Sequence, residues 1–448
     1  MATRIASISG LRGIVGDGLD PAAVVGFAAA YASVREPGPI VVGHDGRASA
    51  PTFLHAVLAG VTATGHDVLL GGPVATPTLG RLVVDRHAVG GIQISASHNP
   101  PQYNGLKFFQ PAGMVLGPDE GKAMLARFER EEFAWVGWNH LGKVHPIDAP
   151  DESHLARVLM TVDIERIRRQ GFTVALDACH GAGGRMGEAL LRDLGCTPIV
   201  LGAAPDGLYD HPPEPTAANL ARFAPIVPAV GAAVGFAQDP DADRLAIIDE
   251  TGRYIGEELT LALAASHRLA QQKGPVVLNL STSRTTEEVA IRHGCPVDRT
   301  PVGEIHVVER MRVLSAVLGG EGNGGVIDPR VGFVRDSFVG MALVLDLLAS
   351  TGEPLSKLVD ALPRHAMLKE SYPRGPGDPR PIFDALEAAY PEAEADHRDG
   401  LRLDVGEAWA HIRASNTEPI FRVIAEAPDP AEARDLSRRV GRWFGAKE

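Results

Sequence analysis

The sequence predicts several α/β domains followed by a smaller α+β domain. A chain of 448 residues is long enough for about three or four domains. Apolar runs that lead through a polar turn into a helical pattern recur near residues 40, 172 and 276. Strands that alternate with helices in this way are typical of βαβ units and a mainly parallel sheet. We interpret the three runs as diverged copies of one α/β unit.

Polar segments divide the chain into four predicted domains, at residues 1–148, 149–253, 254–364 and 365–448. In the first domain we expect helices at 21–33, from 51 and at 76–86, with strands at 40–43, 68–70 and 91–94. In the second we expect strands at 172–177, 198–201, 233–237 and 245–248, with helices ending at Leu194 and spanning 217–223. In the third we expect a strand at 276–280, a helix beyond Thr286 and a helical run at 337–362.

The last domain is predicted to differ from the three α/β domains before it. It is predicted to hold a helix at 381–389, strands at 401–405, 411–412 and 420–425, and a closing helix from Ala431. This order indicates a small α+β domain.

The composition excludes several classes of function. A net charge of −13 argues against a general nucleic-acid binder, although local arginines can still bind a small phosphate. The three cysteines are too scattered for a disulfide framework or a zinc site, as in a reduced cytoplasmic protein. The N-terminus lacks an apolar leader, and the most apolar run, 223–237, is too short to span a bilayer. We expect a cytoplasmic protein with no nucleic-acid or membrane partner.

The segment 91–109 carries a candidate nucleophile. A β run leads into a polar turn with Ser97 and His98, two prolines prevent an immediate helix, and Lys107 lies a short distance downstream. A strand that ends in a short polar loop is a usual place for catalytic residues in an α/β protein. Serine needs a base or a metal to activate it, and the glycines of a G-x-S-x-G elbow are absent. The segment is also consistent with an ordinary Asx or Ser/Thr turn.

A second loop has the chemistry of a metal site. Asp239, Asp241 and Asp243 alternate in a turn after a predicted strand, so several carboxylate oxygens can face one hard cation. Oxygen-only ligands suit Mg²⁺. An EF-hand would place its twelfth ligand at Glu250, but its sixth position is Arg244 instead of glycine. A solvated acidic turn is the remaining alternative.

A glycine-rich loop at 319–325 follows an apolar run. Its glycines allow close approach of a ligand to the backbone, and Glu321 and Asn323 can bind sugar hydroxyls. A hairpin turn explains the glycines nearly as well, but it does not require Glu321.

The last domain contains a candidate phosphate site. Its turn carries a guanidinium, hydroxyls, an amide and backbone N–H groups, from Arg413, Ser415, Asn416, Thr417 and nearby Arg422. An ordinary turn with a surface arginine is the alternative. Together the four loops indicate phosphoryl transfer on a phosphorylated polyol, in a cleft shared by the domains.

With these motifs in this order, the whole chain resembles the α-D-phosphohexomutases. The resemblance implies four domains around a central cleft, three of them similar mixed α/β units and the last a smaller α+β domain. It implies that Ser97 carries the phosphoryl group, and that the three aspartates and the phosphate on Ser97 bind Mg²⁺. It also implies that Glu321 and Asn323 select the sugar, and that Arg413, Ser415, Asn416 and Thr417 bind the substrate phosphate.

The resemblance implies a reaction between hexose 6-phosphate and hexose 1-phosphate through a hexose 1,6-bisphosphate. Arg12 and Lys107 would lie near the transferred group, and Arg244 beside the metal. Lys107 is our candidate general acid/base, with Arg12 as the alternative.

The glycine-rich loop departs from the family pattern Gly-Glu-x-Ser-Gly-His. Asn323 stands in place of the serine and Gly325 in place of the histidine, and His306 is one candidate for the missing imidazole. These changes affect the expected sugar more than the reaction. We favour phosphoglucosamine mutase, with phosphomannomutase or phosphoglucomutase as the alternative.

Two other classes of function remain open. A Mg²⁺-dependent sugar phosphatase would release phosphate from Ser97 to water, and a non-catalytic sensor would only bind a sugar phosphate. In every case the expected partner is a small hexose phosphate, and the protein is expected to be a monomer or a homodimer.

Overall fold

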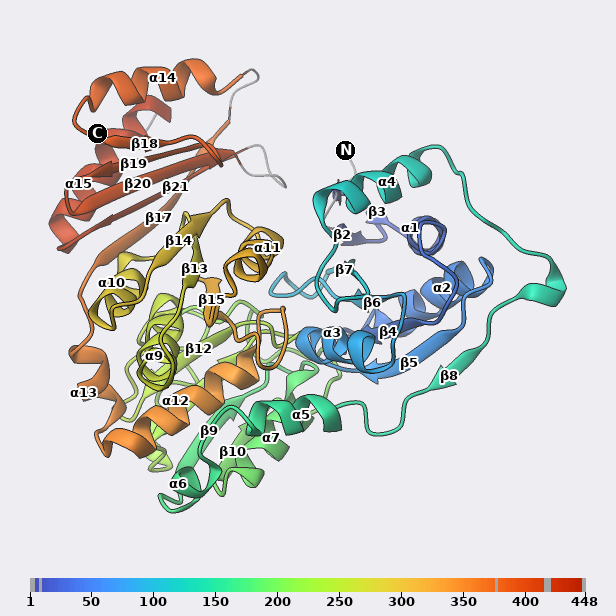
Figure 1. Cartoon of the computed structure of the whole chain (residues 1–448), viewed down its shortest axis with the longest axis horizontal. Coiled ribbons are helices and arrows are strands. Elements are labelled where there is room, and N and C mark those ends of the chain that lie inside the picture. Colours follow the sequence, from blue (N-terminus) through green and yellow to red (C-terminus); the bar gives the residue numbers. More distant parts are fainter. Residues whose placement is uncertain (1–4, 8–9, 375–377, 415–419, 445–448) are drawn as a thin grey trace. The chain divides into compact units, whose positions relative to one another are not determined.

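The structure is a computed structural model that describes residues 5–7, 10–374, 378–414 and 420–444. Figure 1 labels its helices and strands. The chain divides into two compact units, Met1–Arg268 with Asn323–Asp360, and Leu269–Gly322 with Ala361–Glu448. The backbone therefore leaves the first unit after Arg268 and returns to it at Asn323.

The first unit begins with an eight-stranded sheet in the order β1-β2-β7-β6-β4-β5-β8, with β3 beside β2. Strands β6, β4, β5 and β8 are parallel, whereas the neighbouring pairs β6–β7, β7–β2 and β2–β1 are antiparallel. The sheet is therefore mixed, and the antiparallel strand β7 was not predicted. The strands are β1 (Ile5–Ser7), β2 (Gly10–Val15), β3 (Gly18–Leu19), β4 (Ile40–His44), β5 (Val68–Pro73), β6 (Gly90–Ile94), β7 (Tyr103–Phe109) and β8 (Val144–Pro146).

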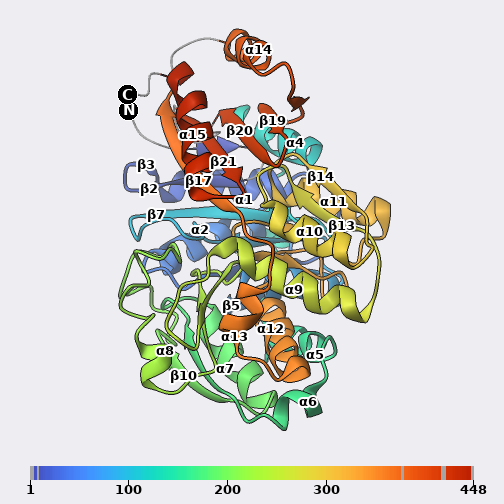
Figure 2. The same ribbon diagram turned by 90° about the vertical axis from the view of Figure 1, so that its left-hand side faces the viewer.

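Helices cover both faces of this sheet, because alternate residues of a strand point to opposite sides. Ile40 and Val42 of β4 pack with α1, α2 and α4, whereas Val41 packs with α3. The helices appear in Figures 1 and 2 and are α1 (Pro21–Ala32), α2 (Ala50–Thr62), α3 (Thr76–Asp85) and α4 (Pro118–Glu129), with a short 3-10 turn at Trp138–His140.

The second sheet of this unit has the order β10-β9-β11-β12. Its first three strands are parallel, and β12 pairs antiparallel with β11 from Val234↔Asp249 to Gln238↔Leu245. Residues 239–244 therefore form the turn of a buried hairpin. The elements around it are α5 (Glu152–Leu159), α6 (Ile164–Arg168), β9 (Thr173–Asp177), α7 (Gly183–Asp193), β10 (Thr197–Leu201), α8 (Ile226–Ala229), β11 (Val234–Gln238), β12 (Leu245–Asp249) and α9 (Glu257–Gln271).

Two predicted helices differ from the structure. The helix expected at 217–223 is a series of turns, and only α8 beyond it is helical. Pro225 explains the difference, because a proline disfavours helical backbone in the residue before it. The run expected at 337–362 is two helices, α12 (Ser337–Thr351) and α13 (Leu355–Asp360). They separate at Gly352, whose φ of 67° ends α12 in the left-handed region.

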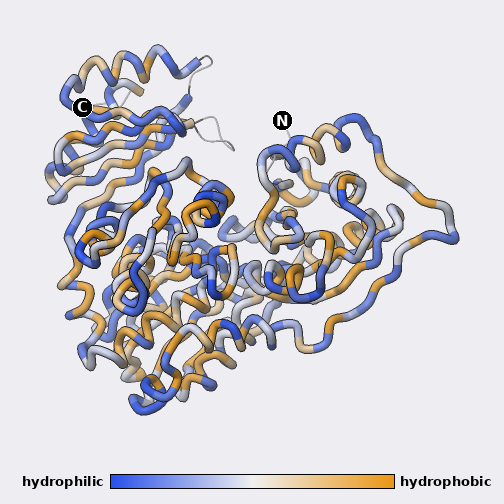
Figure 3. The backbone as a smooth tube through the Cα atoms, in the orientation of Figure 1, coloured by the Kyte–Doolittle hydropathy of each residue, from blue (hydrophilic) through white to orange (hydrophobic). Residues whose placement is uncertain are grey.

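Helix α12 is buried along almost its whole length, and its mostly orange tube in Figure 3 shows that it is also apolar. Its N-cap, Asp336, accepts hydrogen bonds from the first turn of the helix and also from His154 Nε2 at 2.8 Å. The other ring nitrogen of His154 lies 2.9 Å from Thr78 Oγ1. This buried chain of polar groups joins α3, α5 and α12, which are far apart in the sequence.

The second unit holds a parallel sheet and an antiparallel sheet. The parallel strands run in the order β14-β13-β15, and the antiparallel sheet in the order β17-β21-β20-β19-β18. Phe383 of α14 and Leu436 of α15 share one core with the antiparallel sheet. The elements are β13 (Val276–Asn279), α10 (Arg284–Arg292), β14 (Val297–Thr300), α11 (Glu304–Leu314), β15 (Leu318–Glu321), β17 (Ala366–Pro373), α14 (Arg380–Ala389), β18 (Glu394–Asp396), β19 (Leu401–Val405), β20 (Ala408–Ala414), β21 (Ile420–Ala427) and α15 (Pro430–Gly441), with a 3-10 turn at Arg442–Phe444. Strand β16 (Gly325–Ile327) falls in the first unit.

Two expectations from composition can be compared with the structure. Cys179, Cys196 and Cys295 are all buried free thiols. Within the described part of the chain, each helix is too short or too polar to cross a bilayer.

Candidate functional site

Ser97 lies in the loop that follows β6, and its side chain is buried. Its φ of 52° is in the left-handed region, where residues with a Cβ are uncommon. Residues in this conformation cluster at functional sites. The backbone N–H of Ser97 donates to Ser95 Oγ at 2.8 Å. Its Oγ donates to Asp239 Oδ2 at 2.7 Å. The loop thus holds the hydroxyl against the aspartate turn of the second sheet.

Arg47 holds this loop in place. Its guanidinium is 1% exposed and pairs with Asp45, Nε to Oδ2, at 3.0 Å. Its two terminal nitrogens donate to the backbone carbonyls of Ser97, Asn99, Pro100 and Tyr103. A single buried side chain therefore fixes the backbone on both sides of His98.

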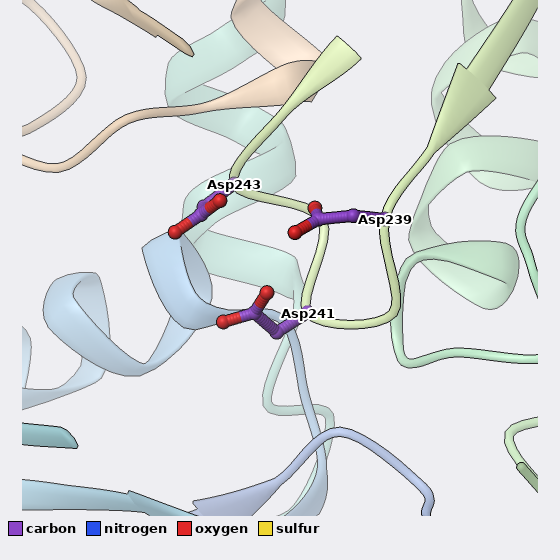
Figure 4. A group of neighbouring side chains, drawn as sticks. All are labelled: Asp239, Asp241 and Asp243. Atoms are coloured by element: carbon purple, nitrogen blue, oxygen red, sulfur yellow. The ribbon is translucent and has the colours of Figure 1, made fainter. Parts of the chain in front are cut away.

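The three aspartates converge at the turn between β11 and β12, as Figure 4 shows. One carboxylate oxygen from each lies within 4.8 Å of the others, and all three side chains are buried. The Oδ1 atoms of Asp241 and Asp243 accept no hydrogen bond from any described residue. Buried acceptors without donors are costly unless a cation or water satisfies them. The oxygen-only donor set fits a hard divalent cation such as Mg²⁺.

The other oxygens of this pair are already bound. Lys107 Nζ lies 2.5 Å from Asp241 Oδ2 and 2.9 Å from Asp243 Oδ2. Thr76, at the start of α3, donates its hydroxyl to Asp241 Oδ2 at 2.5 Å. Burial lowers the pKa of Lys107, but attraction to the two aspartates outweighs burial and raises it above its usual range. The ammonium therefore stays charged.

Two arginines flank Asp243. Arg335 Nη2 donates to Asp243 Oδ2 at 2.6 Å, whereas Arg244 Nε lies 3.9 Å from Oδ1. Burial opposes ionisation of Asp243, but Arg335, Lys107 and Arg244 together hold its pKa well below the usual range. Asp239 differs, because burial and repulsion from the other two aspartates raise its pKa. Lys107, Arg335 and Arg244 thus provide counter-charges to Asp241 and Asp243.

His98 and Arg12 also lie near the serine hydroxyl and the aspartate cluster. His98 Nδ1 is 3.4 Å from Ser97 Oγ, farther away than the carboxylate of Asp239. Arg244, burial and Arg12 lower the pKa of His98 well below its usual value, so the imidazole is neutral. Arg12 Nη1 donates to Asn99 Oδ1 at 2.8 Å, and burial lowers its pKa. This geometry differs from a Ser-His-Asp triad, since the closest acceptor of the hydroxyl is a carboxylate.

The predicted sugar residues fall in different units. Glu321 ends β15 in the second unit, where its buried Oε1 accepts from Asn279 Nδ2 at 2.8 Å and from the N–H of Gly303 at 3.1 Å. Asn323 belongs to the first unit, and its Oδ1 accepts from the N–H of Gly325 at 3.2 Å. His306 is half-buried in the first turn of α11.

The predicted phosphate site is described only in part, because Ser415, Asn416 and Thr417 lie outside the described residues. Arg413 near the end of β20 is directly opposite Arg422 of β21. Arg413 Nε is 3.2 Å from Asp399 Oδ2.

Comparison with known proteins assigns the chain to a family. The family models of the four phosphoglucomutase/phosphomannomutase domains match the chain in order. Alpha/beta/alpha domain I matches residues 4–135, domain II 152–252, domain III 256–365 and the C-terminal domain 380–441. A "Phosphoglucomutase/phosphomannomutase" of Thermococcus kodakarensis is 35% identical over 436 residues, which is 95% of each chain. The chain belongs to the α-D-phosphohexomutase family.

Other relatives of this phosphohexomutase carry different substrate names. A "Probable phosphoglucosamine mutase" of Methanopyrus kandleri is 34% identical over 434 residues, 96% of this chain and 95% of the relative. The crystal structure of a phosphoglucomutase/phosphomannomutase family protein from Burkholderia thailandensis superposes with a TM-score of 0.86 at 25% identity, covering 99% of this chain and 98% of that one. The protein is thus a mutase with three mixed α/β domains and an antiparallel-sheet C-terminal domain.

Sequence reasoning missed three residues of the phosphohexomutase site, namely Arg47, Thr76 and Arg335. Arg47 lies in a polar turn after a predicted strand, which is a weak signal. Thr76 starts a predicted helix, and Arg335 directly precedes one. Their partners lie 50, 165 and 92 residues away in the sequence, so no local pattern connects them to the site.

Proposed function

We propose that this phosphohexomutase interconverts hexose 6-phosphate and hexose 1-phosphate through a phosphoserine at Ser97. The observation that supports this most directly is the 2.7 Å hydrogen bond from Ser97 Oγ to Asp239, beside two further buried aspartates and Lys107. A hydroxyl in such surroundings suits a group that receives and donates a phosphoryl group.

The proposed reaction has two balanced transfers. In the first, the bond from phosphorus to Ser97 Oγ breaks, a bond from phosphorus to a free hydroxyl of the sugar forms, and the proton of that hydroxyl passes to Ser97 Oγ. The product is a hexose 1,6-bisphosphate. In the second, the other phosphoryl group passes to Ser97 Oγ, which gives up its proton, and the sugar oxygen that is released takes up that proton. No phosphate is lost to water.

Asp239, Asp241, Asp243 and the phosphate on Ser97 would hold Mg²⁺, which supplies charge stabilisation to the phosphoryl oxygens and the serine oxygen. The free Oδ1 atoms of Asp241 and Asp243 support this role. Arg244 would stand beside them, since its backbone N–H donates to Asp239 Oδ1 at 3.1 Å.

Proton transfer is assigned to Lys107, with Arg12 as the alternative. The ammonium of Lys107 lies against two of the three aspartates, where it is placed to protonate an oxygen atom as negative charge develops on that atom. His98 is neutral and would orient the hydroxyl of Ser97.

The substrate is proposed to be a small hexose phosphate, with glucosamine phosphate favoured over mannose and glucose phosphates. Similarity to relatives named phosphoglucosamine mutase supports this order. The phosphate would bind Arg413, Arg422, Ser415, Asn416 and Thr417, and Glu321 with Asn323 would bind the sugar. Strand pairing places Arg413 and Arg422 directly opposite one another on β20 and β21, which supports a shared role for them at this position.

The test is ³¹P NMR of the purified protein with Mg²⁺ and a trace of hexose 1,6-bisphosphate. Glucosamine, glucose and mannose 6-phosphates are supplied separately. The expected result is conversion between the 6- and 1-phosphates without inorganic phosphate, fastest with glucosamine phosphate. Release of inorganic phosphate alone would instead establish a phosphatase, and no turnover of any sugar would favour a sensor.

A further inference from the structure

Arg335 is a second cation on the aspartate cluster, and nothing in its local sequence marks it as part of the site. Its guanidinium is 8% exposed and donates to Asp243 Oδ2 at 2.6 Å. Lys107 Nζ reaches the same oxygen at 2.9 Å. Asp243 is thus held by two cations through a single oxygen atom.

This arrangement leaves the other oxygen of Asp243 available. Oδ1 is buried and accepts no hydrogen bond from the described residues. A carboxylate that is bound firmly through one oxygen has a restricted rotation about its terminal bond. The contact with Arg335 therefore determines where Oδ1 lies relative to Asp239 and Asp241.

The side chain of Arg335 can reach Asp243 only because residue 325 is glycine. A Cβ at this position would lie 2.3 Å from Arg335 Cδ, 2.8 Å from its Cγ and 3.0 Å from Asn323 Oδ1. The first two distances are far below van der Waals contact, so a side chain at 325 would displace the arginine. Gly325 and Arg335 are therefore a structural pair: the glycine provides the space that the arginine occupies.

We propose that Arg335 is a positioning residue of the metal site, and that Gly325 is the residue that lets it act. It holds Asp243 so that Oδ1 faces the other two aspartates, as a partner outside the ligand shell does in many metal sites. This inference rests on the proposed function only in requiring that the three aspartates bind a divalent cation.

The experiment measures Mn²⁺ binding to the full-length protein by electron paramagnetic resonance of the free ion. Arg335→Met is expected to weaken binding by about 10- to 100-fold. Arg335→Lys, which keeps the charge, recovers part of the loss. Gly325→Ala weakens binding in the same direction, although it leaves every charge in place. Gly332→Ala is the matched control, because no atom lies within 4 Å of the added Cβ, and it binds Mn²⁺ like the wild type.

The outcomes separate this inference from the proposed metal site. If the wild type fails to bind Mn²⁺, the metal site itself is wrong. If the wild type binds and Arg335→Met binds equally or more tightly, Arg335 acts only as a repelling charge and the inference is overturned. Thermal unfolding with and without Mn²⁺ gives a second measure. A positioning role reduces the stabilisation by Mn²⁺, whereas a structural role lowers both unfolding temperatures equally.

Discussion

Ser97 donates its hydroxyl to Asp239 across 2.7 Å, although 142 residues separate the two in the sequence. One residue follows a strand of the first sheet, and the other begins the turn of a hairpin in the second. The contact brings the candidate nucleophile next to the three aspartates, two of which already pair with Lys107 or Arg335.

Replacement of Ser97 by alanine removes the group that is proposed to carry the phosphoryl. We expect mutase activity to fall by at least about 10³-fold, because the hydroxyl that donates to Asp239 is lost. Intact-protein mass spectrometry after incubation with hexose 1,6-bisphosphate should show no added phosphoryl group. Ser95→Ala is the control, since Ser95 only accepts the backbone N–H of Ser97, and it should still become phosphorylated. Full turnover by Ser97→Ala would contradict the assignment.

Asp241→Asn removes one of the three proposed carboxylate ligands of the cation and one of the two carboxylates that hold Lys107. The Mg²⁺ concentration that gives half-maximal activity should rise by at least about 10-fold. Asp249→Asn is the matched control, because Asp249 is also buried but pairs with Arg253 away from the cluster. It should lower stability without changing the response to Mg²⁺. An unchanged Mg²⁺ dependence in Asp241→Asn would remove this aspartate from the metal site.

Arg47→Met leaves Asp45 as a buried, unpaired carboxylate and releases the carbonyls of the serine loop. Loss of one partner of a buried ion pair costs about 3–5 kcal/mol. Arg47→Lys should recover only part of this, because an ammonium lacks the planar fork that reaches four carbonyls. Urea unfolding measures the stability, with exposed Arg86→Met as the control. A loss no larger than that of Arg86→Met would show that Arg47 does not secure the loop.

Because of the buried His411, we expect the free energy of unfolding to decrease as the pH falls from 6.5 to about 4. Burial lowers the pKa of His411 to about 4, against weaker opposing effects from Asp399. In the fold its Nδ1 lies 2.8 Å from Ser281 Oγ and its Nε2 2.7 Å from the carbonyl of Asp399. His411 takes up a proton near pH 6.5 in the unfolded chain but only near pH 4 in the folded chain. Its contribution to stability is therefore fully present above pH 6.5 and decreases as the pH falls. The loss is on the order of 3 kcal/mol at pH 4.

Thermal unfolding at pH 5.0 and pH 7.5 tests this contribution. The difference between the two unfolding temperatures should be smaller in His411→Gln than in the wild type. His397→Gln is the control, because His397 is exposed and pairs with Glu387 at the surface. Equal differences in all three proteins would show that His411 does not titrate in this way.

The sequence predicted the parts of the fold that local patterns determine. Buried strands such as 40–44 and 234–238 are short apolar runs, and the three aspartates follow one of them at alternate positions. The helix at 217–223 failed because an apolar run with helical spacing cannot be distinguished from a series of turns before a proline. Strand β7 was missed because Lys107 interrupts its apolar run, although that lysine is the residue that reaches the aspartates.

The contacts that complete the site depend on tertiary structure. Arg335 and Thr76 are ordinary residues beside predicted helices, and their roles depend on where those helices end relative to the hairpin turn. The function of Gly325 is even less visible in the sequence. Because it has no side chain, it leaves the space that the side chain of Arg335 occupies. A single sequence contains the residues of a site but not the distances between them.

Because Ser97 precedes Asp239 by 142 residues, the ribosome adds the serine well before the aspartate. At about 5–20 residues per second, the aspartate is added roughly 7 to 28 s after the serine. The polar chain from Thr78 through His154 closes only when Asp336 has been added. A nascent chain therefore holds its acceptor serine long before it has the carboxylates that surround it. The proposed phosphorylation of Ser97 by a sugar bisphosphate therefore requires the completed chain, and truncated products of translation should emerge unmodified.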